Sequence, residues 1–209
     1  MPIDQDPSYD ESNPYVNRDP RLEQTILHQN SVWGNRQQEE ERPVDLRKDL
    51  GIDYVSTHGG TLTGYYTKKF LNKISFKSPS DSPHAWPIFR YGEVLLNAAE
   101  AYNEAGNTAK ALQYINQLRA RVNMPAYTSS MSKEQLRERI RNERRIELCF
   151  EDHRFFDERR WMLFEGKTSS SERNEPRYKQ VYNLYGVVVS GEADDPVYNY
   201  GYAERNTQR

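Results

Sequence analysis

Three glutamates spaced four residues apart, Glu143, Glu147 and Glu151, are the first candidates for chemistry in this sequence. On one helix, side chains with this spacing lie about 5–6 Å from one another. The two carboxyl groups of a retaining glycosidase lie about 5–5.5 Å apart, so catalysis has to be considered. The neighbouring Arg144 and Arg154 argue against it, because nearby guanidinium groups keep carboxylates ionised and prevent the raised pKa of a general acid. We therefore expect these glutamates to be structural and the chain not to be an enzyme.

Other residues that carry catalysis or bind metals are sparse. The histidines form neither an HExxH motif nor a close pair, and they are His28, His58, His84 and His153. Cys149 is the only cysteine, which excludes an internal disulfide and a site of several thiolates. Its place between Leu148 and Phe150 is typical of a small packing residue, a reactive thiol being the alternative. The sequence therefore predicts neither a metal nor a cofactor.

The charge balance argues against nucleic acid as a partner. Five arginines lie within residues 137–145, but Glu138 and Glu143 interrupt the run. Over 209 residues, 29 Lys and Arg oppose 31 Asp and Glu, which gives a formal net charge of −2. A nucleic-acid-binding surface is usually strongly basic. The chain also lacks an apolar run of the roughly 18 residues that a membrane-spanning helix needs, so we expect no membrane span.

Two helices are predicted in the centre of the chain. From Tyr91 onward, apolar residues recur at intervals of three and four, which indicates an amphipathic helix. This set comprises Tyr91, Val94, Leu95, Ala98, Ala99, Ala101, Tyr102 and Ala105. Gly106 and Asn107 end that helix, and Thr108 is the expected N-cap of a second helix over about 109–121. Because the turn is so short, the two helices must pack antiparallel.

This hairpin fits the template of a tetratricopeptide helix pair. The small, aromatic, turn and packing positions are occupied by Ala99, Tyr102, Gly106, Ala111, Ile115 and Leu118. One such unit cannot bury a continuous core, because about three stacked units are needed. We therefore expect the hairpin to leave an apolar face uncovered in the isolated chain.

Residues 132–161 predict one long charged helix, which begins at a capping box of Ser132 and Gln135. At about 100° per residue, its apolar residues share one arc, namely Leu136, Ile140, Ile146, Leu148, Phe150 and Phe155. Charged residues project into the same arc, namely Glu143, Arg144, Glu147, Glu151 and Arg154. An unpaired buried ion costs several kcal/mol, so these charges predict a compact, partly buried ion network. The alternative is a solvated helix with exposed ion pairs.

The flanking regions predict little regular structure. Residues 1–85 are rich in turn-forming residues, with one or two short strands permitted over 65–76. Residues 162–209 hold one plausible strand, at 185–191. Loop aromatics in such regions either stack on the faces of sugars or anchor the loops onto the core, and the sequence leaves both open. We thus expect a loop-rich region 1–85, a helical region 86–161 and a loop-rich tail 162–209.

Three segments, 13–27, 86–125 and 140–161, resemble in this order the SusD/RagB family of Bacteroidetes outer-membrane nutrient-binding proteins. They read NPYVNRDPRLEQTIL, WPIFRYGEVLLNAAEAYNEAGNTAKALQYINQLRARVNMP and IRNERRIELCFEDHRFFDERRW, the third being highly specific. Members of that family are more than twice this long and begin with a lipoprotein signal and a lipidated cysteine. The resemblance therefore implies one partial SusD/RagB-like domain over 1–209, an internal or C-terminal-half piece of a longer protein.

The resemblance implies a mainly α, SusD-like fold with a tetratricopeptide-like hairpin, a long charged helix, irregular loops and minor β structure. It also implies a protein on the outer-membrane surface that binds a glycan, or another oligomeric nutrient. Such a protein hands its ligand unchanged to a SusC-like TonB-dependent transporter, and it meets the membrane only through a lipid anchor that is absent from this chain. The alternative is a tetratricopeptide-like interaction module that binds a peptide.

The resemblance outlines the site residues as well. The predicted ion network falls in the most recognisable motif of the family, which favours a role in the fold, and Arg90 is a candidate partner. Ligands in the family are bound by loop aromatics and polar groups that no motif fixes. Trp33, soon after the Arg-Asp-Pro-Arg element, is the first candidate, followed by Tyr15 and Trp86.

Overall fold

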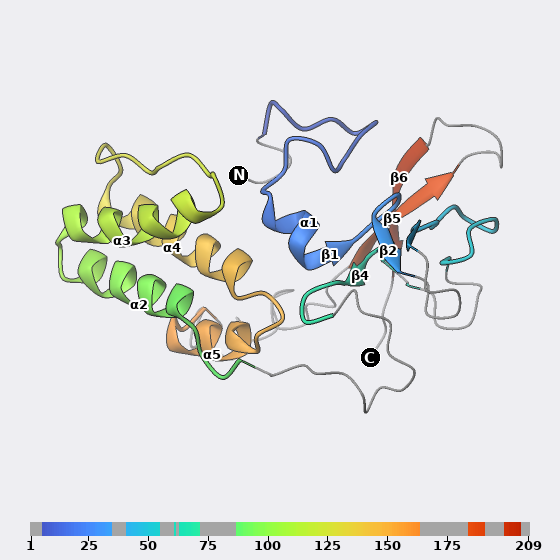
Figure 1. Ribbon diagram of the computed structural model, residues 1–209. Coiled ribbons are helices and arrows are strands. Elements are labelled where there is room, and N and C mark those ends of the chain that lie inside the picture. Colours follow the sequence, from blue (N-terminus) through green and yellow to red (C-terminus); the bar gives the residue numbers. More distant parts are fainter. Residues whose placement is uncertain are drawn as a thin grey trace, which may run out of the picture. The chain divides into compact units, whose positions relative to one another are not determined.

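The computed structural model describes residues 6–34, 41–54, 61, 63–71, 87–163, 184–190 and 199–205. In these ranges the helices are α1 (Arg21–Thr25), α2 (Tyr91–Glu104), α3 (Thr108–Arg121), α4 (Lys133–Glu147) and α5 (His153–Arg160) (Figure 1). The strands are β1 (Ile26–Leu27), β2 (Val32–Gly34), β3 (Glu41–Pro43), β4 (Tyr66–Thr67), β5 (Leu184–Ser190) and β6 (Asn199–Arg205). Helices dominate and the strands are mostly short, so the predicted mainly α fold class is confirmed.

The chain divides into two compact units. The helical unit comprises Asp19–Arg21 and Ala85–Glu172, and it contains α2 to α5. The loop-and-strand unit comprises Met1–Arg18, Leu22–His84 and Arg173–Arg209. The expected single partial domain with its three regions stays a prediction.

In the loop-and-strand unit, the strands described pair as three antiparallel ribbons, β1 with β4, β2 with β3 and β5 with β6. A small core of Leu27, Val44, Leu46 and Val189 lies among them. The amide of Lys48 donates to the carbonyl of Val189 at 2.7 Å, which joins the β5 strand to the residues after β3. The strands predicted near 65–76 and 185–191 are thus present as β4 and β5, while residues 72–76 lie outside the described ranges.

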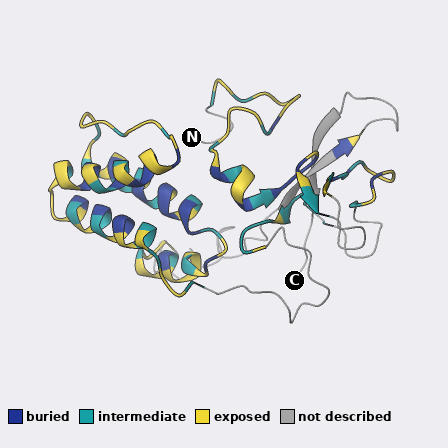
Figure 2. Cartoon of the chain, viewed as in Figure 1, coloured by how far each residue is buried: buried dark blue, intermediate teal, exposed yellow. Residues whose placement is uncertain are grey.

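In the helical unit, α2 and α3 form the predicted antiparallel hairpin, and α4 packs against α2 (Figure 1). Gly106 turns the chain between the two helices in the left-handed conformation, at φ +79°, which glycine adopts without a Cβ penalty. Figure 2 shows buried residues alternating with exposed ones along α2, α3 and α4, as expected of amphipathic helices. Their core comprises Leu95, Leu96, Ala99, Ala111, Leu112, Ile115, Leu118, Leu136, Ile140 and Leu148.

The N-cap of α3 is Asn107, so the prediction of Thr108 is wrong by one residue. The Asn107 side chain accepts a hydrogen bond from the Lys110 amide, and Thr108 is the first residue of the helix. Asn and Thr both favour the N-cap position. Because Asn107 and Thr108 are adjacent, the sequence does not show which of them has the non-helical backbone. The predicted capping box at the start of α4 is confirmed, with reciprocal bonds between Ser132 and Gln135.

The apolar residues predicted on one face of α2 lie on two faces. Leu95 and Ala99 are buried in the core, together with Leu96. Tyr91 and Val94 are 65% and 47% exposed. Intervals of three and four residues fit either face, so the sequence pattern merged two separate stripes.

The predicted long charged helix is two helices, because α4 ends at Glu147 and α5 begins at His153. Between them, Phe150 and Asp152 adopt positive φ angles of 62° and 61°, which an α-helix cannot accommodate. Leu148 still joins the core, but Phe150 and Phe155 leave the predicted apolar arc. Phe150 and Phe155 are accordingly about half exposed and do not join the core.

Asn107→Ala is expected to lower the free energy of unfolding by about 1 kcal/mol, because the Lys110 amide loses its acceptor. Thr108→Ala is the matched control, with an expected change within about 0.5 kcal/mol. Urea unfolding followed by circular dichroism compares the two variants. A larger loss of unfolding free energy for Thr108→Ala than for Asn107→Ala would show that Thr108 is the N-cap.

Candidate functional site

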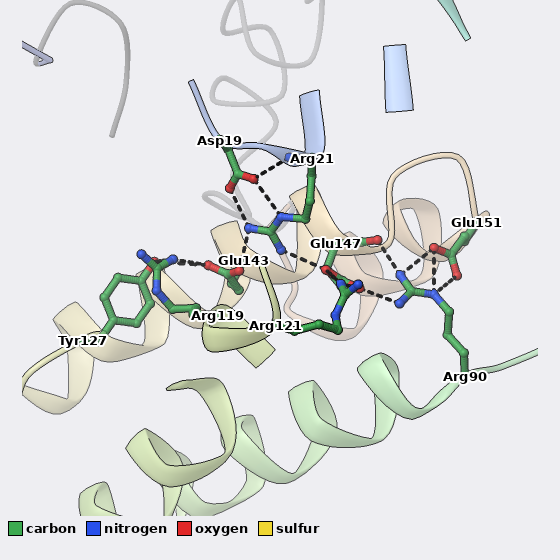
Figure 3. A network of polar contacts seen from close by, with 9 residues as sticks. All are labelled: Asp19, Arg21, Arg90, Arg119, Arg121, Tyr127, Glu143, Glu147 and Glu151. Atoms are coloured by element: carbon green, nitrogen blue, oxygen red, sulfur yellow. Dashed lines mark hydrogen bonds and ion pairs between the residues drawn. The ribbon is translucent and has the colours of Figure 1, made fainter. Parts of the chain in front are cut away.

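Two glutamates on α4 are the centre of a buried ion network in the helical unit (Figure 3). Glu143 and Glu147 are 1% and 3% exposed. They share one face of the helix because they are four residues apart. Charges buried this deeply are tolerated only when they are paired and hydrogen-bonded, so the identity of their partners decides whether the helix can pack here.

Glu143 joins α4 to α3 and to the segment that contains Arg21. Its Oε2 accepts a hydrogen bond from Arg119 Nη1 at 2.5 Å and one from the Tyr127 hydroxyl at 3.4 Å. Its Oε1 lies 2.7 Å from Arg21 Nη2. The Arg119 guanidinium also lies 3.9 Å from the centre of the Tyr127 ring and donates to the Pro125 carbonyl.

Glu147 is held by three arginines from three different segments. Arg21 Nη1 donates to Oε2 at 2.9 Å, and Arg90 Nη1 donates to Oε1 at 2.5 Å. Arg121 Nη2 reaches both oxygens, at 2.7 and 2.8 Å. Because Arg90 precedes α2 and Arg121 ends α3, this single carboxylate fixes both ends of the hairpin to α4.

Arg90 also joins Glu147 to Glu151 in the turn after α4. Arg90 Nε donates to Glu151 Oε2 at 2.9 Å, and its Nη2 donates to Glu151 Oε1 at 2.7 Å. The same Nη2 donates to the Glu147 carbonyl at 2.5 Å. A Cβ at Gly92 would lie 2.6 Å from Arg90 Nη1, so a glycine at this position leaves room for the guanidinium.

Arg21 is oriented by Asp19. Arg21 Nε and Nη2 donate to the two oxygens of that carboxylate at 2.9 and 2.6 Å, a bidentate geometry that fixes the plane of the guanidinium. The backbone amide of Arg21 donates to Asp19 Oδ1 as well. Asp19 thus orients the guanidinium through which the Arg-Asp-Pro-Arg element of residues 18–21 reaches both glutamates on α4.

Burial and ion pairing act in opposite directions on these groups. Burial raises the pKa of Glu147, but hydrogen bonds from Arg90 and Arg21 outweigh it and hold the pKa below its usual value. Burial lowers the pKa of Arg21 and of Arg90, whereas hydrogen bonds to Asp19 and Glu151, respectively, raise both. Glu147 therefore stays ionised at neutral pH and cannot serve as a general acid.

Arg144 and Arg154 lie outside this network, although the sequence placed them in it. Arg144 points to the other side of α4, where its Nε donates to Asp157 at 2.6 Å and its Nη1 donates to Asn97 at 2.6 Å. Arg154 is exposed on α5 and pairs with Glu158 within that helix at 2.5 Å. The break after Glu147 is the reason, since it rotates Arg154 out of the predicted arc.

The sequence prediction missed five of the nine residues of the network, namely Asp19, Arg21, Arg119, Arg121 and Tyr127. One signal was available for Arg119, which follows Leu112 and Ile115 by seven and four residues and so projects into their apolar stripe. Arg21 carried a weaker signal, its place in the Arg-Asp-Pro-Arg element. Neither position reveals which carboxylate it will meet.

Two of the predicted ligand-binding aromatics lie in the loop-and-strand unit. Trp33 is half-buried on β2 and packs against the core that contains Leu27. Tyr15 is half-buried and stacks on the His28 ring, with centroids 3.7 Å apart and planes inclined by 16°. Both rings therefore anchor their loops, and their contact with a ligand stays a prediction. Trp86 lies outside the described residues.

A cavity of about 530 Å³ opens on the helical unit where α4 meets α5. Its walls combine aromatic rings with an arginine, namely Phe150, Phe155, Phe156, Trp161, His153 and Arg145. Cys149 also lines it and is half-buried. In the described part of the chain, no three His, Cys, Asp or Glu side chains gather as metal ligands would. Nor do these residues include a helix of the length and apolarity needed to cross a membrane.

Glu147→Ala is expected to lower the free energy of unfolding by about 3–5 kcal/mol, because three arginines lose a buried counterion. Glu138 on the same helix is exposed and pairs with Arg141, so Glu138→Ala is the control, with a loss below about 1 kcal/mol. Chemical denaturation measures both. Equal losses would show that the buried ion pairs of Glu147 contribute no more to stability than one exposed pair.

The lowered pKa of Glu147 also predicts a pH dependence. A carboxylate with a lower pKa in the folded than in the unfolded state stabilises the fold above its unfolded pKa, near 4.5, and this contribution is lost as the pH falls through the folded value. The difference in unfolding free energy between wild type and Glu147→Gln should thus be constant from pH 7 to about 5 and shrink below it. A difference that grows on acidification would contradict the assignment.

Comparisons with known proteins identify the family to which this chain belongs. The SusD family model matches residues 2–202. SusD-like protein P38 of Formosa agariphila is 34% identical over 88 residues, which cover 38% of this chain and 18% of that protein. SusD-like protein P2 of the same bacterium is 39% identical over 82 residues, which cover 35% and 16%. The matched stretch thus spans less than a fifth of each curated relative.

Solved structures agree with the sequence match. A SusD-like protein of Bacteroides fragilis superposes with a TM-score of 0.70 at 31% identity, over 92% of this chain and 34% of that one. A SusD superfamily protein of Bacteroides vulgatus gives a TM-score of 0.52 at 26% identity, over 82% and 34%. The chain therefore spans about a third of these proteins. Because the family model matches almost its whole length, the predicted resemblance is confirmed and this chain belongs to the SusD family.

Proposed function

We propose that this chain is part of a surface protein that binds a glycan, or another oligomeric nutrient, and delivers it to a SusC-like TonB-dependent transporter. The observation that carries the proposal is the SusD family match over residues 2–202. The protein would be located at the outer membrane and exposed on the cell surface, held by a lipid anchor. Ligand and transporter would be its partners, without nucleic acid.

The state of the α4 carboxylates supports binding without catalysis. Glu143 and Glu147 are buried and engaged by arginines on several sides. A retaining glycosidase needs two carboxyl groups that face a cleft, one of them protonated, whereas Glu147 is buried among arginines that hold its pKa below the usual value. The acidic residues that first suggested chemistry therefore act as a scaffold, and ligand recognition falls to other surfaces.

The loop aromatics remain the best candidates for the ligand contact. Trp33 is packed on one side against the core of the loop-and-strand unit and is partly accessible. A ring held in this way loses little conformational entropy when a sugar stacks on it, which is an advantage for a binding platform. The Tyr15 ring is held in a similar way, because it stacks on His28 and makes an edge contact with Tyr65.

Trp33→Ala is expected to abolish binding of soluble polysaccharides, measured by isothermal titration calorimetry with a panel of glycans. Because Trp33 also packs against the core, its loss will lower the melting temperature as well. Leu27→Ala is the matched control, since Leu27 lies in the same core and is buried. Binding retained by Leu27→Ala and lost by Trp33→Ala supports the proposal. Binding retained by both removes Trp33 from the site, and no binding by wild type to any glycan in the panel contradicts the glycan proposal.

A further inference from the structure

Three phenylalanine rings are exposed around the cavity where α4 meets α5. Phe150, Phe155 and Phe156 are 47%, 55% and 66% exposed. All three line the cavity, whose volume is about 530 Å³. This volume lies within the range of small-molecule sites, about 300–1,000 Å³. Water-exposed aromatic surface gathered around a cavity of this size is typical of a ligand-binding site.

Contacts with neighbouring side chains fix the rings of this cavity. The Phe155 and Phe156 rings meet edge to face, with centroids 5.3 Å apart and planes inclined by 83°. The Arg159 guanidinium lies 3.3 Å from the centre of the Phe155 ring. The indole N–H of Trp161 donates to Glu100 Oε1 at 2.8 Å, which holds that ring against α2. Rings that are already ordered lose little conformational entropy when a flat ligand stacks on them.

Two charged side chains of the cavity wall stay available to a ligand. Arg145 and Asp152 line the cavity, and in the described part of the chain their side chains make neither an ion pair nor a hydrogen bond. The other charged wall residues are paired within the protein, namely Arg144, Arg154 and Asp157. A guanidinium only donates hydrogen bonds and a carboxylate only accepts them. The cavity therefore offers one charged donor and one charged acceptor, whose charges balance.

We infer that this cavity binds one sugar residue of a neutral glycan, at a site separate from the loop aromatics. The C–H face of a sugar ring stacks on aromatic side chains, and its hydroxyl groups both donate and accept hydrogen bonds. An anionic sugar is less suited, because Asp152 would repel the charge that Arg145 attracts. The choice of a sugar over another flat, neutral ligand rests on the proposed function.

The sole cysteine of the chain reports on this cavity, because Cys149 lines it. Intact mass spectrometry follows the alkylation of the 209-residue chain by iodoacetamide, with and without methyl glycosides of neutral hexoses and pentoses. At twice its Kd, a glycoside that occupies the cavity should slow the alkylation of Cys149 about threefold. The inference is overturned if none of these glycosides slows the reaction, or if aromatic dipeptides protect Cys149 equally well.

Calorimetry with the same glycosides tests the wall residues. Phe156→Ala should weaken binding about tenfold, since it removes the most exposed of the three phenylalanine rings. Phe89→Ala is the matched control, because Phe89 is 73% exposed and does not line the cavity. Arg145→Gln, which removes the available charged donor, should weaken binding about threefold or more. Equal weakening by Phe156→Ala and Phe89→Ala, or binding that neither changes, also overturns the inference.

A failure of this site is distinguishable from a failure of the proposed function. Polysaccharide binding that Trp33→Ala abolishes, together with a Cys149 that no glycoside protects, would overturn the cavity site and leave the proposed function intact. Protection of Cys149 by a glycoside, together with no binding of any polysaccharide, would support the cavity site and contradict the proposed function.

Discussion

The helical unit depends on the pairing of two buried carboxylates with four arginines. Glu143 and Glu147 are adjacent on α4, but their partners come from the Asp19–Arg21 segment, from the residue before α2 and from the last turn of α3. A buried ion without its partner costs several kcal/mol, so each of these segments can pack only where its guanidinium meets a carboxylate. Apolar packing brings the helices together, and the ion pairs fix their register.

Local backbone features serve this network. Left-handed conformations at Phe150 and Asp152 cost free energy for residues other than glycine, and they occur in the turn that brings Glu151 to Arg90. Gly92 leaves space for the same guanidinium. The cost of the left-handed turn is thus offset by three hydrogen bonds from Arg90 to Glu151.

The two units differ in the side chains that they present, and this difference fits the proposed binding function. The helical unit holds Glu143, Glu147 and Glu151 in ion pairs with arginines. The loop-and-strand unit places half-buried aromatic rings on a small core, with Tyr15 stacked on His28 and Trp33 packed on β2. Rigid scaffolds that carry aromatic loops are a common way to vary ligands while keeping the fold.

The sequence by itself determined the local features of this protein. The antiparallel hairpin, the Ser132 capping box, the C-terminal ends of α2 and α3, the strands β4 and β5 and the family all follow from periodicity, capping residues and motifs over a few tens of residues. Glu143 and Glu147 also stood out, because charges inside an apolar arc must find partners.

Only the tertiary structure decided which partners those are. The contacts of Arg21 and Arg119 with Glu143 span 122 and 24 residues of sequence, and no local pattern encodes which distant side chains will meet. The break after Glu147, the exclusion of Arg144 and Arg154 from the network and the two faces of α2 have the same origin. Helical periodicity reports that a residue lies on a face, whereas the neighbouring segments decide what that face contacts.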